Sequence, residues 1–149
     1  MSSDLPQTGI GHFGWGRWLA LYSAASFLML GIDAAMNHHQ IIYENRWSYT
    51  PLILAPLAVL VSLMGVFSAR WRWQAWIIGL LALIVGGAGV VFHNLPTIME
   101  RGDVSLWQSL LNAPRPVLAP ASFAATGVLL LLISWGEGRQ RRPGPTEKE

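Results

Sequence analysis

The fold is decided by the stretch Leu52–Ala69, LILAPLAVLVSLMGVFSA, which contains no charged side chain. A helix needs about 17–25 predominantly apolar residues to cross the hydrocarbon core of a bilayer, and this stretch is long enough. Three further stretches share its length and apolar character: Trp18–Met36, Trp76–Phe92 and Val117–Trp135. The sequence therefore predicts an all-α integral membrane protein, a bundle of four transmembrane helices.

Composition supports a membrane protein and excludes several other classes. Hydrophobic residues make up 52% of the 149 residues and charged residues only 12%, whereas soluble domains contain about 25% charged residues. A net charge of +2 is too small to indicate a nucleic-acid partner. The chain has no cysteine, which excludes disulfides and thiolate metal sites. The partners that we expect are the lipid bilayer and other membrane protein subunits.

The distribution of Lys and Arg predicts how the chain is oriented. No basic cluster precedes the first apolar stretch, so we expect that helix to be retained and residues 1–16 to form a cytoplasmic segment. The N-terminus, the second connection and the C-terminus hold seven basic residues, and the other two connections hold three. Because cytoplasmic segments are enriched in Lys and Arg, both termini are expected in the cytoplasm of a multi-pass protein of the cell (inner) membrane.

Two smaller elements complete the predicted organisation around a membrane domain at 17–135. The outer connection Asn94–Pro116 contains an amphipathic segment near 103–112, which predicts a short interfacial helix. The tail at 136–149 mixes Gly, Pro and charged residues, a composition typical of a disordered cytoplasmic segment.

An internal repeat relates the two halves of the chain. A shift of 55 positions aligns residues of the first half with identical residues of the second, among them Arg17 with Arg72, Trp18 with Trp73, Ala20 with Ala75, Gly31 with Gly86, His38 with His93, and Arg46 with Arg101. Both halves start on the same side of the membrane. The pattern therefore predicts two tandem αα-hairpins related by a pseudo-two-fold axis along the membrane normal.

Small residues and a histidine recur at seven-residue spacing in the first and third helices. The first helix carries Ala24, Gly31 and His38, and the third carries Gly79, Gly86 and His93. Such spacing predicts that these two helices cross closely, with both histidines together at the outer membrane face. A seam this narrow leaves little room for a porphyrin, so it favours a metal ion or a direct contact between the histidines.

The candidate site is this pair, His38 and His93, as ligands of a metal ion or haem or as a quinone site. Glu44 and Glu100 are further candidate metal ligands. Asp33 lies about one turn inside the outer boundary, where an acid needs a partner such as Arg46 or Arg101. The alternative is that the histidines are interfacial polar residues, hydrogen-bonded across the helix pair.

These features favour an accessory or cofactor-holding subunit of a membrane electron-transfer or photosynthetic complex, without catalytic activity of its own. The alternatives are a small stand-alone transporter or channel and a membrane-embedded, metal-dependent enzyme. The few hydroxyl residues in the apolar stretches, among them Ser23, Ser62 and Thr126, argue against a polar path across the membrane.

Overall fold

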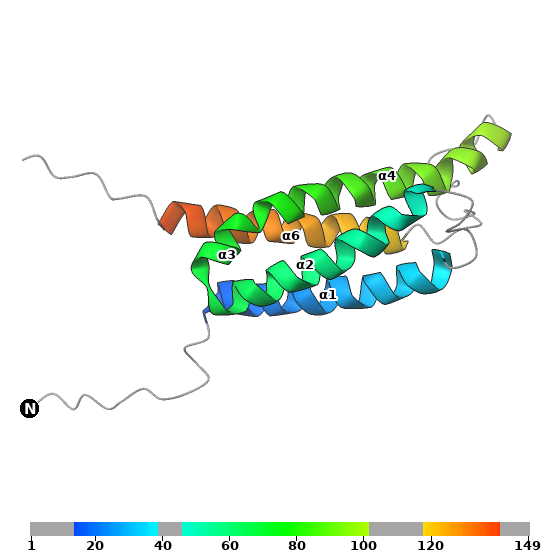
Figure 1. The fold of residues 1–149 in the computed structure, drawn as a ribbon. Coiled ribbons are helices and arrows are strands. Elements are labelled where there is room, and N and C mark those ends of the chain that lie inside the picture. Colours follow the sequence, from blue (N-terminus) through cyan, green and yellow to red (C-terminus); the bar gives the residue numbers. More distant parts are fainter. Residues whose placement is uncertain (1–13, 39–45, 102–117, 141–149) are drawn as a thin grey trace, which may run out of the picture.

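The computed structural model describes residues 14–38, 46–101 and 118–140, with the backbone alone for residues 95–98, 100, 101 and 140. All regular structure within these ranges is helical (Figure 1). Four helices are long and apolar enough to cross a membrane, which confirms the predicted number and type. They are α1 (Trp15–His38), α2 (Tyr49–Phe67), α4 (Trp76–Arg101) and α6 (Leu118–Gln140). A 3-10 turn, η2 (Arg46–Ser48), precedes α2, and a short helix, α3 (Ala69–Gln74), joins α2 to α4.

The helices are longer than the apolar stretches that predicted them. Helix α4 continues past the expected end at Phe92 to Arg101, so the connection expected from Asn94 begins as helix. Helix α6 continues past Trp135 to Gln140, so the tail expected to be disordered from position 136 starts as helix as well. The interfacial helix predicted near 103–112 lies outside the described residues.

The four long helices form a ring in the order of the chain. Helix α1 packs on α2, α2 on α4, α4 on α6, and α6 on α1 (Figure 1). Helices α1 and α4 are therefore diagonal to each other and scarcely touch. We call the end with the start of α1 and the end of α6 the terminal end, and the opposite end, with His38 and His93, the histidine end.

The small residues pack within each hairpin and not between α1 and α4, so the predicted seam is wrong. A Cβ atom added at Gly31 would lie 2.9 Å from the Ala55 Cβ on α2. One added at Gly86 would lie 2.5 Å from the Ala124 amide nitrogen on α6. Heptad spacing identifies the face of a helix that packs closely, but it does not say which neighbour occupies that face.

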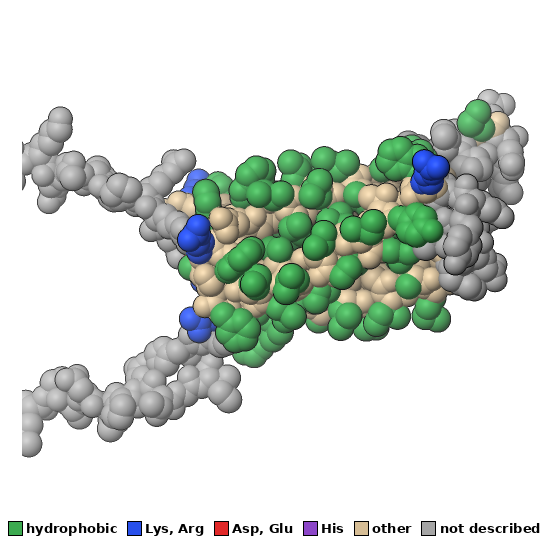
Figure 2. Space-filling view, viewed as in Figure 1, with side chains coloured by type: hydrophobic (Ala, Val, Ile, Leu, Met, Phe, Trp, Pro, Cys, Tyr) green, Lys and Arg blue, Asp and Glu red, His purple; other side chains and the backbone are tan. Residues whose placement is uncertain are grey.

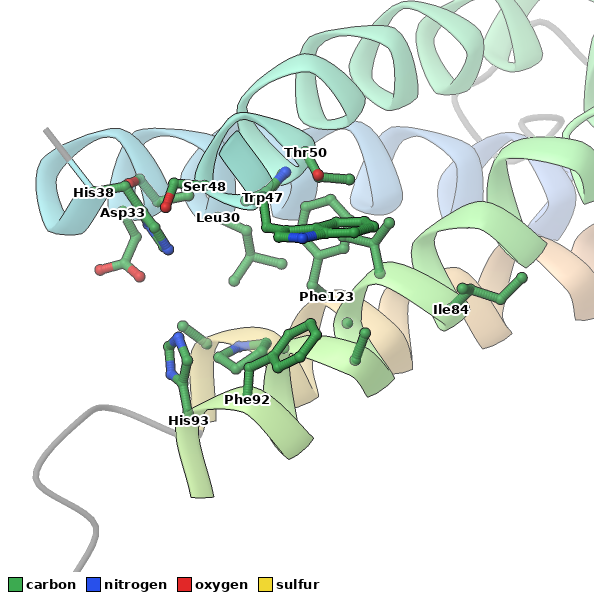
Figure 3. Close-up of a pocket in the computed structure, with 18 residues that line it drawn as sticks. Leu30, Asp33, His38, Trp47, Ser48, Thr50, Ile84, Phe92, His93 and Phe123 are labelled. Carbon is green, nitrogen blue, oxygen red and sulfur yellow. The ribbon is translucent and has the colours of Figure 1, made fainter. Parts of the chain in front are cut away.

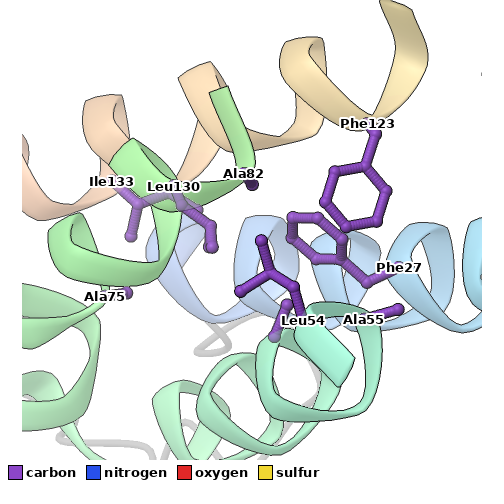
Figure 4. Close-up of a cluster of buried hydrophobic side chains, with 9 residues drawn as sticks. Phe27, Leu54, Ala55, Ala75, Ala82, Phe123, Leu130 and Ile133 are labelled. Atoms are coloured by element: carbon purple, nitrogen blue, oxygen red, sulfur yellow. The ribbon is translucent and has the colours of Figure 1, made fainter. Parts of the chain in front are cut away.

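The exterior and interior of the bundle suit a lipid environment. Exposed apolar side chains cover its middle, and basic side chains lie at its two ends (Figure 2). The buried cluster combines alanines, such as Ala55 and Ala82, with larger side chains, and its Phe27 and Phe123 rings are in edge-to-face contact at 5.1 Å (Figure 4). Close helix packing through small residues is how membrane bundles associate where burial from water contributes little.

A partly buried ion pair joins the helices at the terminal end, and nothing in the sequence pattern predicted it. The Arg72 Nε donates to a Glu137 carboxylate oxygen, and the two side chains are only 12% and 13% exposed. The Arg72 Nη1 also donates to the Gly65 carbonyl at 2.7 Å, and the Ser134 hydroxyl donates to the Arg72 carbonyl at 2.8 Å. Arg72 thus ties α3 to both α2 and α6.

Candidate functional site

His38 ends α1 with its ring fixed by its own helix. The ring Nδ1 lies 2.8 Å from the Ala34 carbonyl oxygen one turn earlier. A carbonyl oxygen can only accept a hydrogen bond, so Nδ1 carries the proton. In the neutral ring the Nε2 lone pair is then available to a metal or to a proton donor. Histidines that ligate metals are commonly held in this way through the other ring nitrogen.

His93 approaches the same point from the diagonal helix α4. The centroids of the two rings are 6.3 Å apart and their planes are inclined by 33°. Both residues are half-buried, and they lie on opposite sides of a shared space (Figure 3). The structure thus brings together the two histidines that the 55-residue shift pairs in the sequence.

A half-open cavity of about 580 Å³ lies between α1 and α4 at the histidine end, and some of its lining residues, such as Trp47 and Phe92, are exposed (Figure 3). Its volume falls within the roughly 300–1,000 Å³ typical of cofactor and small-molecule sites. The polar side chains that line it are Asp33, His38, Ser48, Thr50 and His93. The remaining lining residues are apolar or glycine, and they include Trp47, Phe92 and Phe123.

The aromatic residues give the cavity two walls and an inner limit. The Trp47 and Phe92 rings lie with their centroids 6.5 Å apart, inclined by 39°. The Phe123 side chain is only 4% exposed and packs against Phe27 in the core. The cavity therefore ends where the buried cluster of the bundle begins, and its polar groups lie on the side of the histidine end.

The other predicted site residues are only partly brought to this cavity. Asp33 lines it, but the carboxylate accepts from the Asn37 amide at 3.0 Å and has no arginine or histidine partner among the described residues. Arg46 is exposed and immediately precedes Trp47. Glu44 lies outside the described residues, and only the backbone is described for Glu100 and Arg101.

Within the described part of the chain, no three His, Asp or Glu residues lie close enough together to hold a metal ion. His38 and His93 thus provide a two-ligand arrangement there. A group held there by the described residues alone would bring the rest of its coordination with it, or would bind through hydrogen bonds and apolar contacts.

The hydroxyl groups of the bundle give no continuous polar path in the ranges that the structure covers. The Ser23 hydroxyl donates to the Leu19 carbonyl at 2.8 Å, and the Thr126 hydroxyl to the Ser122 carbonyl at 2.9 Å. These two groups are satisfied by their own helices, whereas the buried Ser62 hydroxyl has no hydrogen-bond partner among the described residues. Such an arrangement is typical of hydroxyl residues packed inside a helix bundle and offers little to a hydrated ion or solute.

The fold and the site together define a four-helix chain, compatible with a membrane, that has a cofactor-sized cavity between two diagonal helices. No family model, curated protein or solved structure matches this chain.

Proposed function

We propose that this protein is a small membrane subunit that holds a redox cofactor at the histidine end for a larger electron-transfer or photosynthetic assembly. The observation that carries this proposal is the 580 Å³ cavity, into which two half-buried imidazoles project from diagonal helices. Aliphatic and aromatic walls with a few convergent polar groups are typical of cofactor sites. Structural histidines that bond across a helix pair do not need such a space between them.

An accessory role follows from how little of the described chain lies outside the bundle. The described ranges form four membrane-compatible helices and short joining segments, with no separate folded domain. Substrate-level chemistry would therefore reside in partner chains. In this proposal the protein supplies the cofactor and a lateral surface, and it is not itself an enzyme.

The two hairpins are proposed to be tandem repeats related by an axis along the bundle. Two features support this: α1 packs on α2 as α4 packs on α6, and the paired residues Gly31 and Gly86 both lie in those contacts. The distribution of basic residues favours cytoplasmic termini in the cell membrane. The cavity would then open toward the outer face.

The proposal is tested by purifying the full-length protein gently from its native membrane. Bound small molecules and metals are then identified by mass spectrometry, optical spectroscopy and elemental analysis, together with any co-purifying chains. We expect one cofactor per chain and at least one larger redox protein. A protein that emerges alone, without cofactor or metal, would contradict the proposal.

A cavity-filling variant makes this test specific. Ala88 lines the cavity, and in Ala88→Trp the indole would occupy the space that the cofactor needs. We expect this variant to lose most of the bound cofactor. The matched control is Leu132→Trp, because Leu132 is 56% exposed on α6 and does not line the cavity. Equal cofactor content in the two variants would show that the cofactor binds elsewhere.

A further inference from the structure

We infer that the cofactor is a single haem whose iron is held between His38 and His93. This inference rests on the proposed function and specifies its ligand.

The separation of the rings fits two imidazoles on opposite sides of one metal ion. A metal–imidazole nitrogen bond is about 2.0 Å, and the ring centroid lies roughly 1.1 Å beyond the nitrogen, so two such rings have centroids about 6 Å apart. A direct hydrogen bond between ring nitrogens, at about 2.9 Å, would bring the centroids to roughly 5 Å. The observed 6.3 Å agrees with the first arrangement.

The orientation of His38 also favours a metal over an oxidised quinone. Its Nδ1 proton is engaged with the Ala34 carbonyl, so the neutral ring offers a lone pair at Nε2. Iron requires that lone pair, whereas a quinone carbonyl requires a hydrogen-bond donor. With Nδ1 engaged, the neutral His38 ring can act at Nε2 as a metal ligand but not as a hydrogen-bond donor.

The number of ligands among the described residues favours haem over a free metal ion. Two histidines leave a free ion with too few protein ligands in the described residues, where no cluster of three is present. A porphyrin brings four nitrogens of its own, so two axial histidines complete a six-coordinate iron. The porphyrin also brings a large apolar face, which matches the apolar lining of the cavity.

Small residues lie beneath each histidine, although Pro120 packs against Gly89, where an added Cβ atom would lie 2.8 Å from the Pro120 Cβ. A side chain on a helix leans toward the N-terminus, over the residue four positions earlier. That residue is Ala34 beneath His38 and Gly89 beneath His93, and both line the cavity. The macrocycle would lie between α1 and α4 along the bundle, with Phe123 below it. Its carboxylates would point to the open end, where Arg46 is exposed.

The inference is tested by titrating ferric haem into the full-length protein, purified in mild detergent and stripped of bound cofactor. We expect one haem per chain, with the absorption and paramagnetic-resonance spectra of low-spin iron bound by two histidines. His38→Gly and His93→Gly should each lower haem affinity at least tenfold and give high-spin spectra. Added imidazole should restore the low-spin spectrum, because it replaces the missing ring. The matched control is His39→Ala, which should retain the wild-type spectrum.

Each alternative outcome has a distinct meaning. Low-spin haem that survives in both glycine variants would overturn the assignment of these ligands. A native protein that contains a quinone or a metal ion, but binds no haem, would overturn this inference and leave the cofactor-holding role intact. A native protein without any cofactor, which also fails to bind haem, would overturn both.

Discussion

Gly86 and Gly87 are adjacent on α4, but they face different surroundings. A Cβ atom at Gly86 would lie 2.5 Å from the Ala124 amide nitrogen and 2.6 Å from the Pro120 carbonyl oxygen. At Gly87 nothing lies within 4 Å. Because the obstacles at Gly86 belong to the backbone of α6, they cannot move aside as a flexible side chain would. This contact sets how closely α4 and α6 approach beside the cavity.

We therefore predict that Gly86→Ala lowers the free energy of unfolding by about 1–3 kcal/mol, the usual cost of overpacking. Gly87→Ala is the matched control, and we expect it to be neutral or stabilising by up to about 1 kcal/mol, since alanine favours helix. The eight tryptophans allow thermal unfolding in detergent to be followed by intrinsic fluorescence. Equal stability of the two variants would show that α4 and α6 do not approach as closely as described.

Among the polar residues, the sequence predicted which groups share one end of the bundle but not which partners they bond. His38 and His93 lie together as their equivalent positions in the two halves suggested. Asp33, in contrast, is bonded by Asn37 one turn later on the same helix. This hydrogen bond within the helix competes with an ion pair to a distant arginine. The spacing of residues in the sequence does not show which of these two interactions forms.

For the helices, hydropathy predicted four that are long and apolar enough to cross a membrane, because length and apolar content decide whether a segment can cross a bilayer. It did not predict their packing partners. Gly31 and Gly86 mark close-packing faces on α1 and α4, but each faces the next helix in the chain. This difference changes the chemistry of the site. The two diagonal helices are free to separate around a cavity, and the objection to a porphyrin no longer applies.

The Arg72–Glu137 ion pair could not be predicted from the sequence either. The two residues are 65 positions apart, and Glu137 follows the apolar stretch that predicted the last helix. A helix that ended at Trp135 would have left this carboxylate in the tail. Because α6 continues to Gln140, Glu137 is held against α3.

We predict that Arg72→Ala destabilises the protein more than Glu137→Gln does, because Arg72 also donates to the Gly65 carbonyl. Breaking a buried ion pair costs about 3–5 kcal/mol. Because the two side chains remain 12% and 13% exposed, we expect the loss in free energy of unfolding to lie at the lower end of that range. Thermal unfolding in detergent measures both variants.

Arg70→Ala is the matched control for this pair, since Arg70 is exposed two positions earlier, and we expect its effect to stay within about 0.5 kcal/mol. The double variant Arg72→Ala/Glu137→Gln should lose less stability than the sum of the two single variants. Strict additivity would mean that the two charges do not interact in the folded protein.

At the scale of the whole molecule, four membrane-compatible helices bring the start of α1 and the end of α6 to the same end of the bundle (Figure 1). In a membrane, the histidine end would lie on the side opposite the termini. The N-terminal segment, the connection around α3 and the C-terminal segment hold seven basic residues, and the other two connections hold three. Together these two facts predict cytoplasmic termini and a cavity that opens outward.

Because the chain has no cysteine, single cysteines can report this topology without background. We expect Thr8→Cys and Thr146→Cys to react with a membrane-impermeant maleimide only after the cells are lysed, and Gln40→Cys to react in intact spheroplasts. A reversed pattern would keep the four spans but place the cavity on the cytoplasmic side, so that electron-transfer partners would have to meet it there. Termini labelled from opposite sides would contradict the even number of spans, and with it the placement of both histidines at one membrane face.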